Sequence, residues 1–428
     1  MSDSSPAARP ASGHANYALG VLFCVYVVNL IDRQILSILM EPIKRDLNLS
    51  DTQLGLLSGL SFALFYAIAG IPIARAADRM SRRNIIAGAL VIWSALTALC
   101  GVAQNFWQLM LTRIGVAVGE AGGGPPAHSM LADFFPHGKR STALAIYSCG
   151  VPVGVLIGLA AGGWLNQAFD WRIAFVVVGL PGVILAGVLF FTVKEPPREA
   201  TPAAPTAEEP RPSTMEVLKT IWAIRSFRNL AVATALHVFS AYALLQWNPT
   251  FMVRTYELGT AQVGLYLGLL VGVCSGIGTF LGGWLGDVFA KRGQRWYARL
   301  PGLEIGITVP FYFGAYFAPS FEIALAFLVV PTLLSNAFTG PVFGAIQSLA
   351  PPHMRAMAAA LLLFVIAVVG QGLGPQAVGL LSDLFRSQAG NDSLRWAMAV
   401  IVFSKVLASW RFWVAGKQLE EDLEAVKG

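Results

Sequence analysis

The stretches ARAADRMSRR (residues 74–83) and GWLGDVFAKR (residues 283–292) decide the fold, because the same pattern of charge occurs twice in one chain. Aligning Asp78 with Asp287 places Arg82 and Arg83 over Lys291 and Arg292. The offset is 287 − 78 = 209 residues, close to half of the 428-residue chain. Such repeats are typical of membrane transport folds in which two related halves enclose a binding site near the bilayer midplane.

The composition around these stretches is that of an integral membrane protein. The chain is 55% hydrophobic and 13% charged, whereas about 25% of a soluble domain is charged. Its apolar residues form blocks of about 20, the length that crosses a hydrocarbon core. We predict an all-α protein with twelve spans, near residues 17–40, 52–76, 84–104, 107–134, 141–168, 171–193, 227–253, 260–289, 299–318, 321–350, 356–385 and 394–415.

A stretch rich in proline and charge divides these spans into two groups of six. We therefore expect a tail over 1–16, a six-helix bundle over 17–193, a linker over 194–226, a second bundle over 227–415 and a tail over 416–428. Ser213 and Glu216 have the spacing of a capping box, which predicts a short helix in the linker. A solvated linker without further structure is the alternative.

The basic residues indicate the orientation. With the N-terminus inside, seventeen Lys and Arg fall in inner connections and six in outer ones, which predicts both termini in the cytoplasm. The first apolar block is too long for a signal peptide, and we expect a bacterial inner membrane. Because the charge of +6 is spread over short loops, we expect no nucleic-acid partner. Four scattered cysteines show no metal-ligand spacing, and we expect no metal and no cofactor.

The two repeated stretches resemble the signature G-x-x-x-D-[RK]-x-G-[RK]-[RK] of the major facilitator superfamily. The first copy carries Ala74 and Ser81 in place of both glycines, whereas the second keeps Gly283 but has Val288 and Ala290 inside the pattern. The resemblance implies two pseudo-symmetric bundles of six transmembrane helices. It also implies a secondary active transporter that works by alternating access, and not an enzyme.

Three further stretches resemble the spinster family within that superfamily. They are NLIDRQIL (29–36), RIGVAVGEAG (113–122) and VPVG (151–154). This resemblance implies movement of lysolipid- or sphingolipid-type molecules, coupled at least sometimes to protons.

Two of these stretches place Asp32, Arg33, Arg113 and Glu120 inside apolar spans. Each unpaired charge at the centre of a membrane costs roughly 2.5–3.5 kcal/mol on insertion scales. Because adjacent helical residues point about 100° apart, Asp32 and Arg33 need partners on another helix. We predict the pairs Arg33–Glu120 and Asp32–Arg113. A fixed salt bridge between two helices is one interpretation, and a network that rearranges and binds a proton is the other.

The repeated loops predict a cytoplasmic gate of ion pairs, made of Asp78, Arg79, Arg82, Arg83, Asp133, Asp287, Lys291 and Arg292. The alternative is that these residues only fix the orientation and contact lipid headgroups. The second half offers a polar and aromatic wall of a substrate cavity, with His237, Tyr242, Gln246, Trp247 and Asn336. A packed role is the favoured interpretation of His237.

Together these features predict a proton-linked carrier of a lysolipid-like or other amphipathic organic anion or zwitterion. We expect a functional monomer whose partners are the bilayer and this small molecule, with protons as the coupling ion. The alternative within the same class is a carrier or exporter of small organic acids, sugars or drugs. An enzyme is disfavoured because we find no nucleophile motif, metal cluster or phosphate-binding loop. The sequence leaves the direction of transport open.

Overall fold

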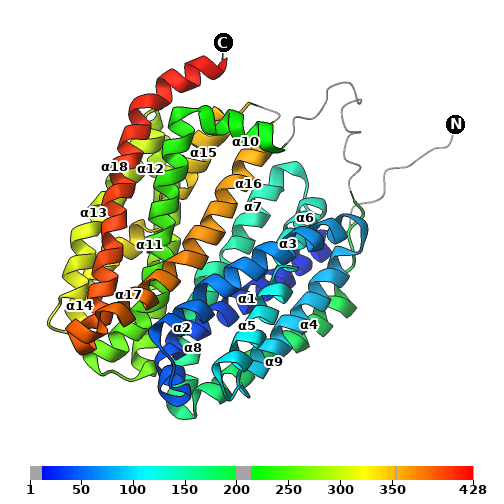
Figure 1. Cartoon of the computed structure of the whole chain (residues 1–428). Coiled ribbons are helices and arrows are strands. Elements are labelled where there is room, and N and C mark those ends of the chain that lie inside the picture. Colours follow the sequence, from blue (N-terminus) through cyan, green and yellow to red (C-terminus); the bar gives the residue numbers. More distant parts are fainter. Residues whose placement is uncertain (1–11, 199–213, 352–353, 428) are drawn as a thin grey trace.

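The computed structural model describes residues 12–198, 214–351 and 354–427, and within these ranges the chain is helical without a strand. The helices form two bundles that lie side by side (Figure 1). Twelve helical rods are present in the described residues, six in each bundle, as predicted.

The first bundle has the following rods: α1 (Ser12–Leu47); α2 (Asp51–Gly55), η1 (Leu56–Leu60) and α3 (Ser61–Arg79) in one line; α4 (Arg82–Cys100); α5 (Phe106–Glu120) with α6 (Gly124–Phe134); α7 (His137–Ser148) with α8 (Gly150–Ala168); and α9 (Trp171–Thr192). The second has α11 (Arg225–Tyr256); α12 (Thr260–Ala290); α13 (Trp296–Tyr316); α14 (Phe321–Leu334) with α15 (Thr339–Leu349); α16 (Arg355–Val365), η3 (Ile366–Leu373) and α17 (Gly374–Ala389); and, after η4 (Gly390–Asp392), α18 (Ser393–Lys427).

Helix breaks fall where the sequence weakens the helix. The fourth rod is interrupted between Glu120 and Gly124, at the glycine-rich stretch before Pro125 and Pro126. Proline is tolerated at the first positions of a new helix and disruptive inside one. Because of this interruption, α6 can take a direction different from that of α5, which carries Arg113.

The predicted end of the last helix differs from the structure. Residues 416–428, expected as a tail, continue α18 as a helix to Lys427, because Leu419 and Leu423 are buried against the second bundle. The linker contains the expected short helix, α10 (Thr214–Ala223), whereas its capping residue Ser213 lies outside the described residues.

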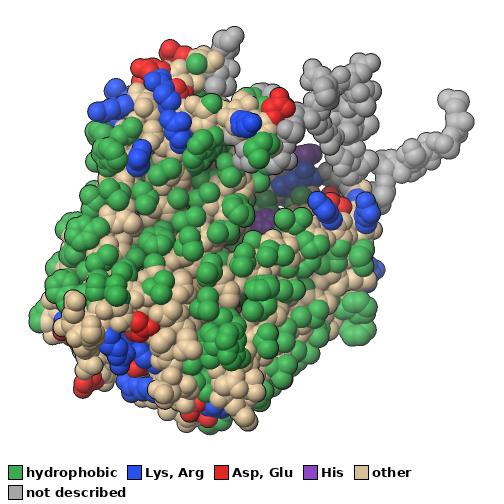
Figure 2. Space-filling view, viewed as in Figure 1, with side chains coloured by type: hydrophobic (Ala, Val, Ile, Leu, Met, Phe, Trp, Pro, Cys, Tyr) green, Lys and Arg blue, Asp and Glu red, His purple; other side chains and the backbone are tan. Residues whose placement is uncertain are grey.

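On the face seen in Figure 2, the outer surface of both bundles carries an apolar band. Large side chains such as Phe191, Phe280, Ile184 and Trp107 are mostly exposed. Nine helical segments of the described chain are each long and apolar enough to cross a membrane, and the last of them, Met357–Ala425, covers two antiparallel rods. An exposed apolar band of this extent is stable only in contact with lipid.

The two ends of the molecule differ. We call the end at which α1 begins and α18 ends the terminal end, and the other the opposite end (Figure 1). Near the opposite end and the middle, the bundles meet through α8 on α12, α2 on α17 and α1 on α11. At the terminal end, Figure 2 shows a hollow between the bundles in which histidine and basic side chains are visible. The molecule is therefore closed at one end and open at the other.

Candidate functional site

The first predicted ion pair is present in the middle of the first bundle. The Nε of Arg33 on α1 donates to Oε2 of Glu120 on α5 over 2.5 Å. The Glu120 side chain is fully buried, whereas that of Arg33 keeps 21% exposure. The guanidinium also lies over the rings of Phe62 and Tyr66, 5.1 and 4.9 Å from their centroids. An arginine bound by one carboxylate and two rings is stabilised while its side chain stays partly exposed.

The second predicted pair is not formed. Arg113 donates through Nη1 to the backbone carbonyl of Asp32 over 3.3 Å, not to its carboxylate. The guanidinium is drawn instead towards the Phe62 ring, whose centroid lies 5.4 Å away. Within the described residues, both carboxylate oxygens of Asp32 are buried and have no hydrogen-bond partner.

Polar groups of α4 surround this carboxylate at longer range. The indole of Trp93 and the hydroxyl of Thr97 are close enough to influence it, but neither meets the geometry of a hydrogen bond. Both side chains are buried. Asp32, Arg33, Arg113 and Glu120, here called the central charge cluster, thus contain one closed ion pair and one carboxylate without a direct partner.

The second bundle approaches this cluster through Tyr242 of α11. Tyr242 lies within electrostatic range of Arg33, and a Cβ added at Gly370 would come within 2.9 Å of the tyrosine ring. The tyrosine therefore stands where η3, α11 and the first bundle meet.

The other residues predicted for a cavity wall are placed differently. Trp247 is fully buried and donates to the carbonyl of Pro375 over 2.9 Å, so that it packs α11 on α17. His237 is buried, with its Nε2 3.1 Å from the carbonyl of Ser335. In this conformation both are packed side chains and do not face open space. Gln246 is half-buried and Asn336 is exposed.

At the terminal end, Arg82 is the centre of a charged cluster within the first bundle. Its Nη1 lies 2.5 Å from Asp133 and its Nε lies 2.8 Å from Glu195. Glu195 also accepts from the hydroxyl of Ser81 and the backbone N–H of Arg83, each over 2.9 Å. Burial raises the pKa of this carboxyl, but these hydrogen bonds and the Arg82 charge outweigh it and lower the pKa below 4.5.

The start of the linker is also fixed there. Arg198 donates to the backbone carbonyls of Ala77, Asp78 and Met80, which close the C-terminus of α3. A basic side chain at a helix C-terminus satisfies free carbonyls and complements the helix dipole. The sequence does not predict these roles of Glu195 and Arg198, since both lie within the predicted linker over 194–226.

The remaining predicted gate residues form no ion pair across the bundles within the described chain. Arg83 lies over the Phe190 ring at 4.9 Å, and Arg292 lies over the Phe289 ring at 5.0 Å. For the side chains of Asp78, Arg79, Asp287 and Lys291, no ion pair is present among the described residues. Because the terminal end is open here, the gate stays a prediction.

The opposite end holds an ionic connection between the bundles that was not predicted from the sequence. Arg254 of α11 donates to Glu41 of α1 over 2.5 Å and to the two carboxylate oxygens of Asp51 over 2.6 and 2.8 Å. Lys44 and Ser382 also bind the Asp51 carboxylate, over 2.5 and 2.6 Å. The carboxylate is fully buried, and its four donors come from both bundles.

A second carboxylate of the second bundle caps a helix of the first. Asp383 of α17 accepts the backbone N–H groups of Asp51 and Thr52 over 3.1 and 2.7 Å, and the Thr52 hydroxyl over 2.6 Å. An acid at a helix N-terminus satisfies free N–H groups and complements the dipole. We call Glu41, Lys44, Asp51, Arg254, Ser382 and Asp383 together the bundle lock.

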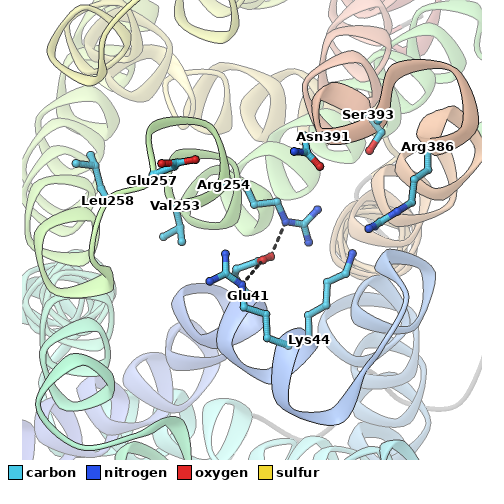
Figure 3. Close-up of a pocket in the computed structure, with 11 residues that line it drawn as sticks. Glu41, Lys44, Val253, Arg254, Glu257, Leu258, Arg386, Asn391 and Ser393 are labelled. Atoms are coloured by element: carbon cyan, nitrogen blue, oxygen red, sulfur yellow. Dashed lines mark hydrogen bonds and ion pairs between the residues drawn. The ribbon is translucent and has the colours of Figure 1, made fainter.

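A pocket of about 480 Å³ adjoins the bundle lock (Figure 3). Its charged lining consists of Glu41, Lys44, Arg45, Arg254, Glu257 and Arg386. It lies at the closed end, remote along α1 from Arg33, and is therefore separate from the central charge cluster. In the described residues, no group of three His, Cys, Asp or Glu side chains lies close enough together to hold a metal ion.

Comparison with known proteins finds relatives that agree with the predicted superfamily. The sequence model of the major facilitator superfamily matches residues 22–417. The chain is 34% identical over 422 residues to an MFS-type efflux pump of Mycolicibacterium smegmatis, with 98% of this chain and 97% of the relative covered. It is 26% identical over 424 residues to protein spinster homolog 1 of Xenopus tropicalis, with 94% and 80% covered.

A solved structure matches along almost the whole length. It is a crystal structure of a bacterial homolog to the human lysosomal transporter spinster, in an inward-facing and unoccupied conformation. The TM-score is 0.87 and the sequence identity 30%, over 96% of this chain and 99% of that one.

Proposed function

We propose a specific activity on the premise that this chain belongs to the major facilitator superfamily and is a multi-pass membrane transporter. The transported molecule is an amphipathic organic anion or zwitterion of lysolipid or sphingolipid type, and its movement is coupled to protons by alternating access. The terminal end faces the cytoplasm of a bacterial cell, and one chain is the functional unit. The excess of basic residues in the loops of the terminal end supports this orientation.

One observation carries the proposal: the Arg33–Glu120 pair lies in the first bundle with its arginine still partly exposed. An anionic headgroup that reaches Arg33 competes with Glu120 for the same N–H donors. A carboxylate that loses its arginine partner binds a proton more readily. Ligand arrival and proton uptake are then linked at a single guanidinium.

Asp32 supplies a second place for a proton. Its carboxylate lacks a cation within hydrogen-bond distance, so its charge can change without breaking the Arg33–Glu120 pair. The rings of Phe62 and Tyr66 beside Arg33 offer an apolar surface for the chain of an amphipathic ligand.

A second candidate is export of drugs or small organic acids, which the 34% identity to an efflux pump favours. It uses the same cluster, and the two candidates differ in what lies beyond the headgroup. Flux measurements on proteoliposomes, with lysophospholipid and with a lipophilic drug as separate substrates, distinguish them.

The test of coupling compares wild-type protein with Glu120→Gln, with and without an imposed pH gradient. The amide keeps the size of the carboxylate but takes up no proton. We therefore expect substrate flux to lose most of its dependence on the gradient, with Asp32 left as the remaining proton site. Arg172→Gln, which breaks an exposed pair with Asp46 inside the first bundle, is the control and should behave as wild type. If Glu120→Gln transports with the wild-type response to pH, the coupling proposal is wrong.

A further inference from the structure

The pocket at the opposite end is lined by more basic than acidic side chains, and the proposed transport mechanism involves none of them. Lys44, Arg45, Arg254 and Arg386 line it, against two acids, Glu41 and Glu257. In Figure 3 the head groups of Lys44, Arg254 and Arg386 point into the same space. The three cations come from α1, α11 and α17, and therefore from both bundles.

Three of the four cations already have carboxylate partners. Lys44 and Arg254 share Asp51, Arg254 also binds Glu41, and Arg45 lies 3.0 Å from Glu41. Arg386 forms no ion pair with any described residue of the chain, and it is exposed to the pocket.

Arg386 is nevertheless close to other positive charge. Both Arg386 and Arg254 are near enough to the Lys44 amine for their charges to oppose its own. Like charges gathered at one site are unfavourable unless an anion joins them. The Asn391 amide and the Ser393 hydroxyl, which also line the pocket, add neutral hydrogen-bonding groups at the same rim.

We propose that this pocket binds an oxyanion, a phosphate or a carboxylate group, between Arg386, Lys44 and Arg254, and that its binding weakens the bundle lock. The guanidinium of Arg386 presents N–H donors in a fork that matches such an anion. The cavity of about 480 Å³ accommodates more than the anionic group alone.

The effect on the lock follows from shared donors. An oxyanion bound by Lys44 and Arg254 competes with the carboxylates of Asp51 and Glu41 for the same N–H groups. Since Arg254 connects α11 to α1 and α2 through these acids, weaker contacts favour separation of the bundles at the opposite end. This site is independent of which molecule passes the central charge cluster.

The experiment uses purified full-length protein and inorganic phosphate as the probe. Calorimetric titration gives the affinity, and chloride at equal ionic strength controls for screening. Arg386→Gln should weaken phosphate binding roughly tenfold to a hundredfold, as expected for loss of one charge-assisted contact. Arg172→Gln removes a half-buried arginine at the same end and outside the pocket, and it should bind phosphate as wild type does.

A second arm asks whether a lipid supplies the anion. Thermal stability is compared in nanodiscs with and without phosphatidylglycerol, for wild type, Arg386→Gln and Arg172→Gln. A phosphatidylglycerol effect that only Arg386→Gln abolishes supports the site with a lipid headgroup as its occupant. Phosphate binding that only Arg386→Gln weakens supports it with a free ion.

The link to the lock has its own readout. Distance measurements between labels at positions 104 and 319, which are exposed on the two bundles at the opposite end, should lengthen when phosphate is added to wild type. Binding without a change in this distance overturns the effect on the lock. Equal phosphate and lipid responses in wild type and Arg386→Gln overturn the site itself.

Discussion

Replacing Arg254 by glutamine should open the opposite end of the molecule. The side chain makes three charge-assisted hydrogen bonds, of 2.5, 2.6 and 2.8 Å, to Glu41 and Asp51 of the other bundle. It is 15% exposed, and its partners are 9% and 0% exposed, so solvent screens these contacts little.

The magnitude follows from what remains after the substitution. A hydrogen bond to a charged group contributes about 1.5–3 kcal/mol, but Asp51 keeps Lys44 and Ser382, and Glu41 keeps Arg45. We therefore expect the closed state to lose about 3 kcal/mol rather than the full sum. That corresponds to roughly a hundredfold shift of the equilibrium between closed and open states.

Distance distributions between spin labels at positions 104 and 319 measure the shift. The four free cysteines, Cys24, Cys100, Cys149 and Cys274, are replaced first. Arg172→Gln is the matched control, because its 2.5 Å pair with Asp46 has the same length but lies within one bundle. An unchanged distribution in Arg254→Gln, or an equal change in Arg172→Gln, would refute the assignment of these contacts as a lock.

Two further predictions concern other contacts of the fold. Glu195→Gln should lower the melting temperature at neutral pH. The pKa of Glu195 is lowered from 4.5 in the folded protein, so the difference in melting temperature from wild type should shrink as the pH falls below 4.5 and through the folded pKa. A melting difference that is constant with pH would argue against a role of the charge. Gly163→Ala should destabilise the α8–α12 interface, since the added Cβ would lie 2.2 Å from the Thr260 carbonyl oxygen; a melting temperature equal to that of Gly187→Ala, where no atom lies within 4 Å of an added Cβ, would contradict the close approach.

Most of the fold could be predicted because a membrane allows few solutions. Apolar blocks of fixed length define the spans, and the repeat around Asp78 and Asp287 defines the two halves. Local irregularities within the helices could not be predicted from the sequence. The π-helical turns η1 and η3 lie next to each other where α2–α3 and α16–α17 cross. Because the apolar pattern hardly changes there, hydrophobic periodicity gives no signal for them.

The candidate sites differ in how visible they are in sequence. Arg33 and Glu120 are conspicuous because a charge is costly inside an apolar span, and their pairing follows from helical geometry. The expected side-chain pair between Asp32 and Arg113 is not formed. Helical periodicity predicts which face of a helix a residue occupies, but not how far and in which direction an arginine side chain extends. A backbone carbonyl and an aromatic ring were better placed for Arg113.

The bundle lock was missed for the opposite reason. Glu41, Lys44, Asp51 and Arg254 lie at the ends of apolar runs, where charged residues are ordinary. One signal was present: Ser50 and Gln53 form a capping box that fixes the start of α2 and thereby the position of Asp51. The residues that complete the lock, Ser382 and Asp383, are more than 300 positions away in the chain. Sequence spacing contains no information on such contacts.

The distribution of charged contacts limits how the proposed coupling can work. Arg33 and Glu120 both belong to the first bundle, so breaking or forming their pair does not by itself change any contact between the bundles. The bundle lock joins the bundles, but it lies at the closed end and not at the central charge cluster. Protonation in the cluster therefore needs an intermediary that touches both bundles. Tyr242 of the second bundle lies within electrostatic range of Arg33, and a ligand bound between these two side chains would supply that connection. In the proposed mechanism, a proton bound at Asp32 in the empty carrier therefore leaves the bundles in place, and only the occupied carrier converts proton binding into closure around the ligand.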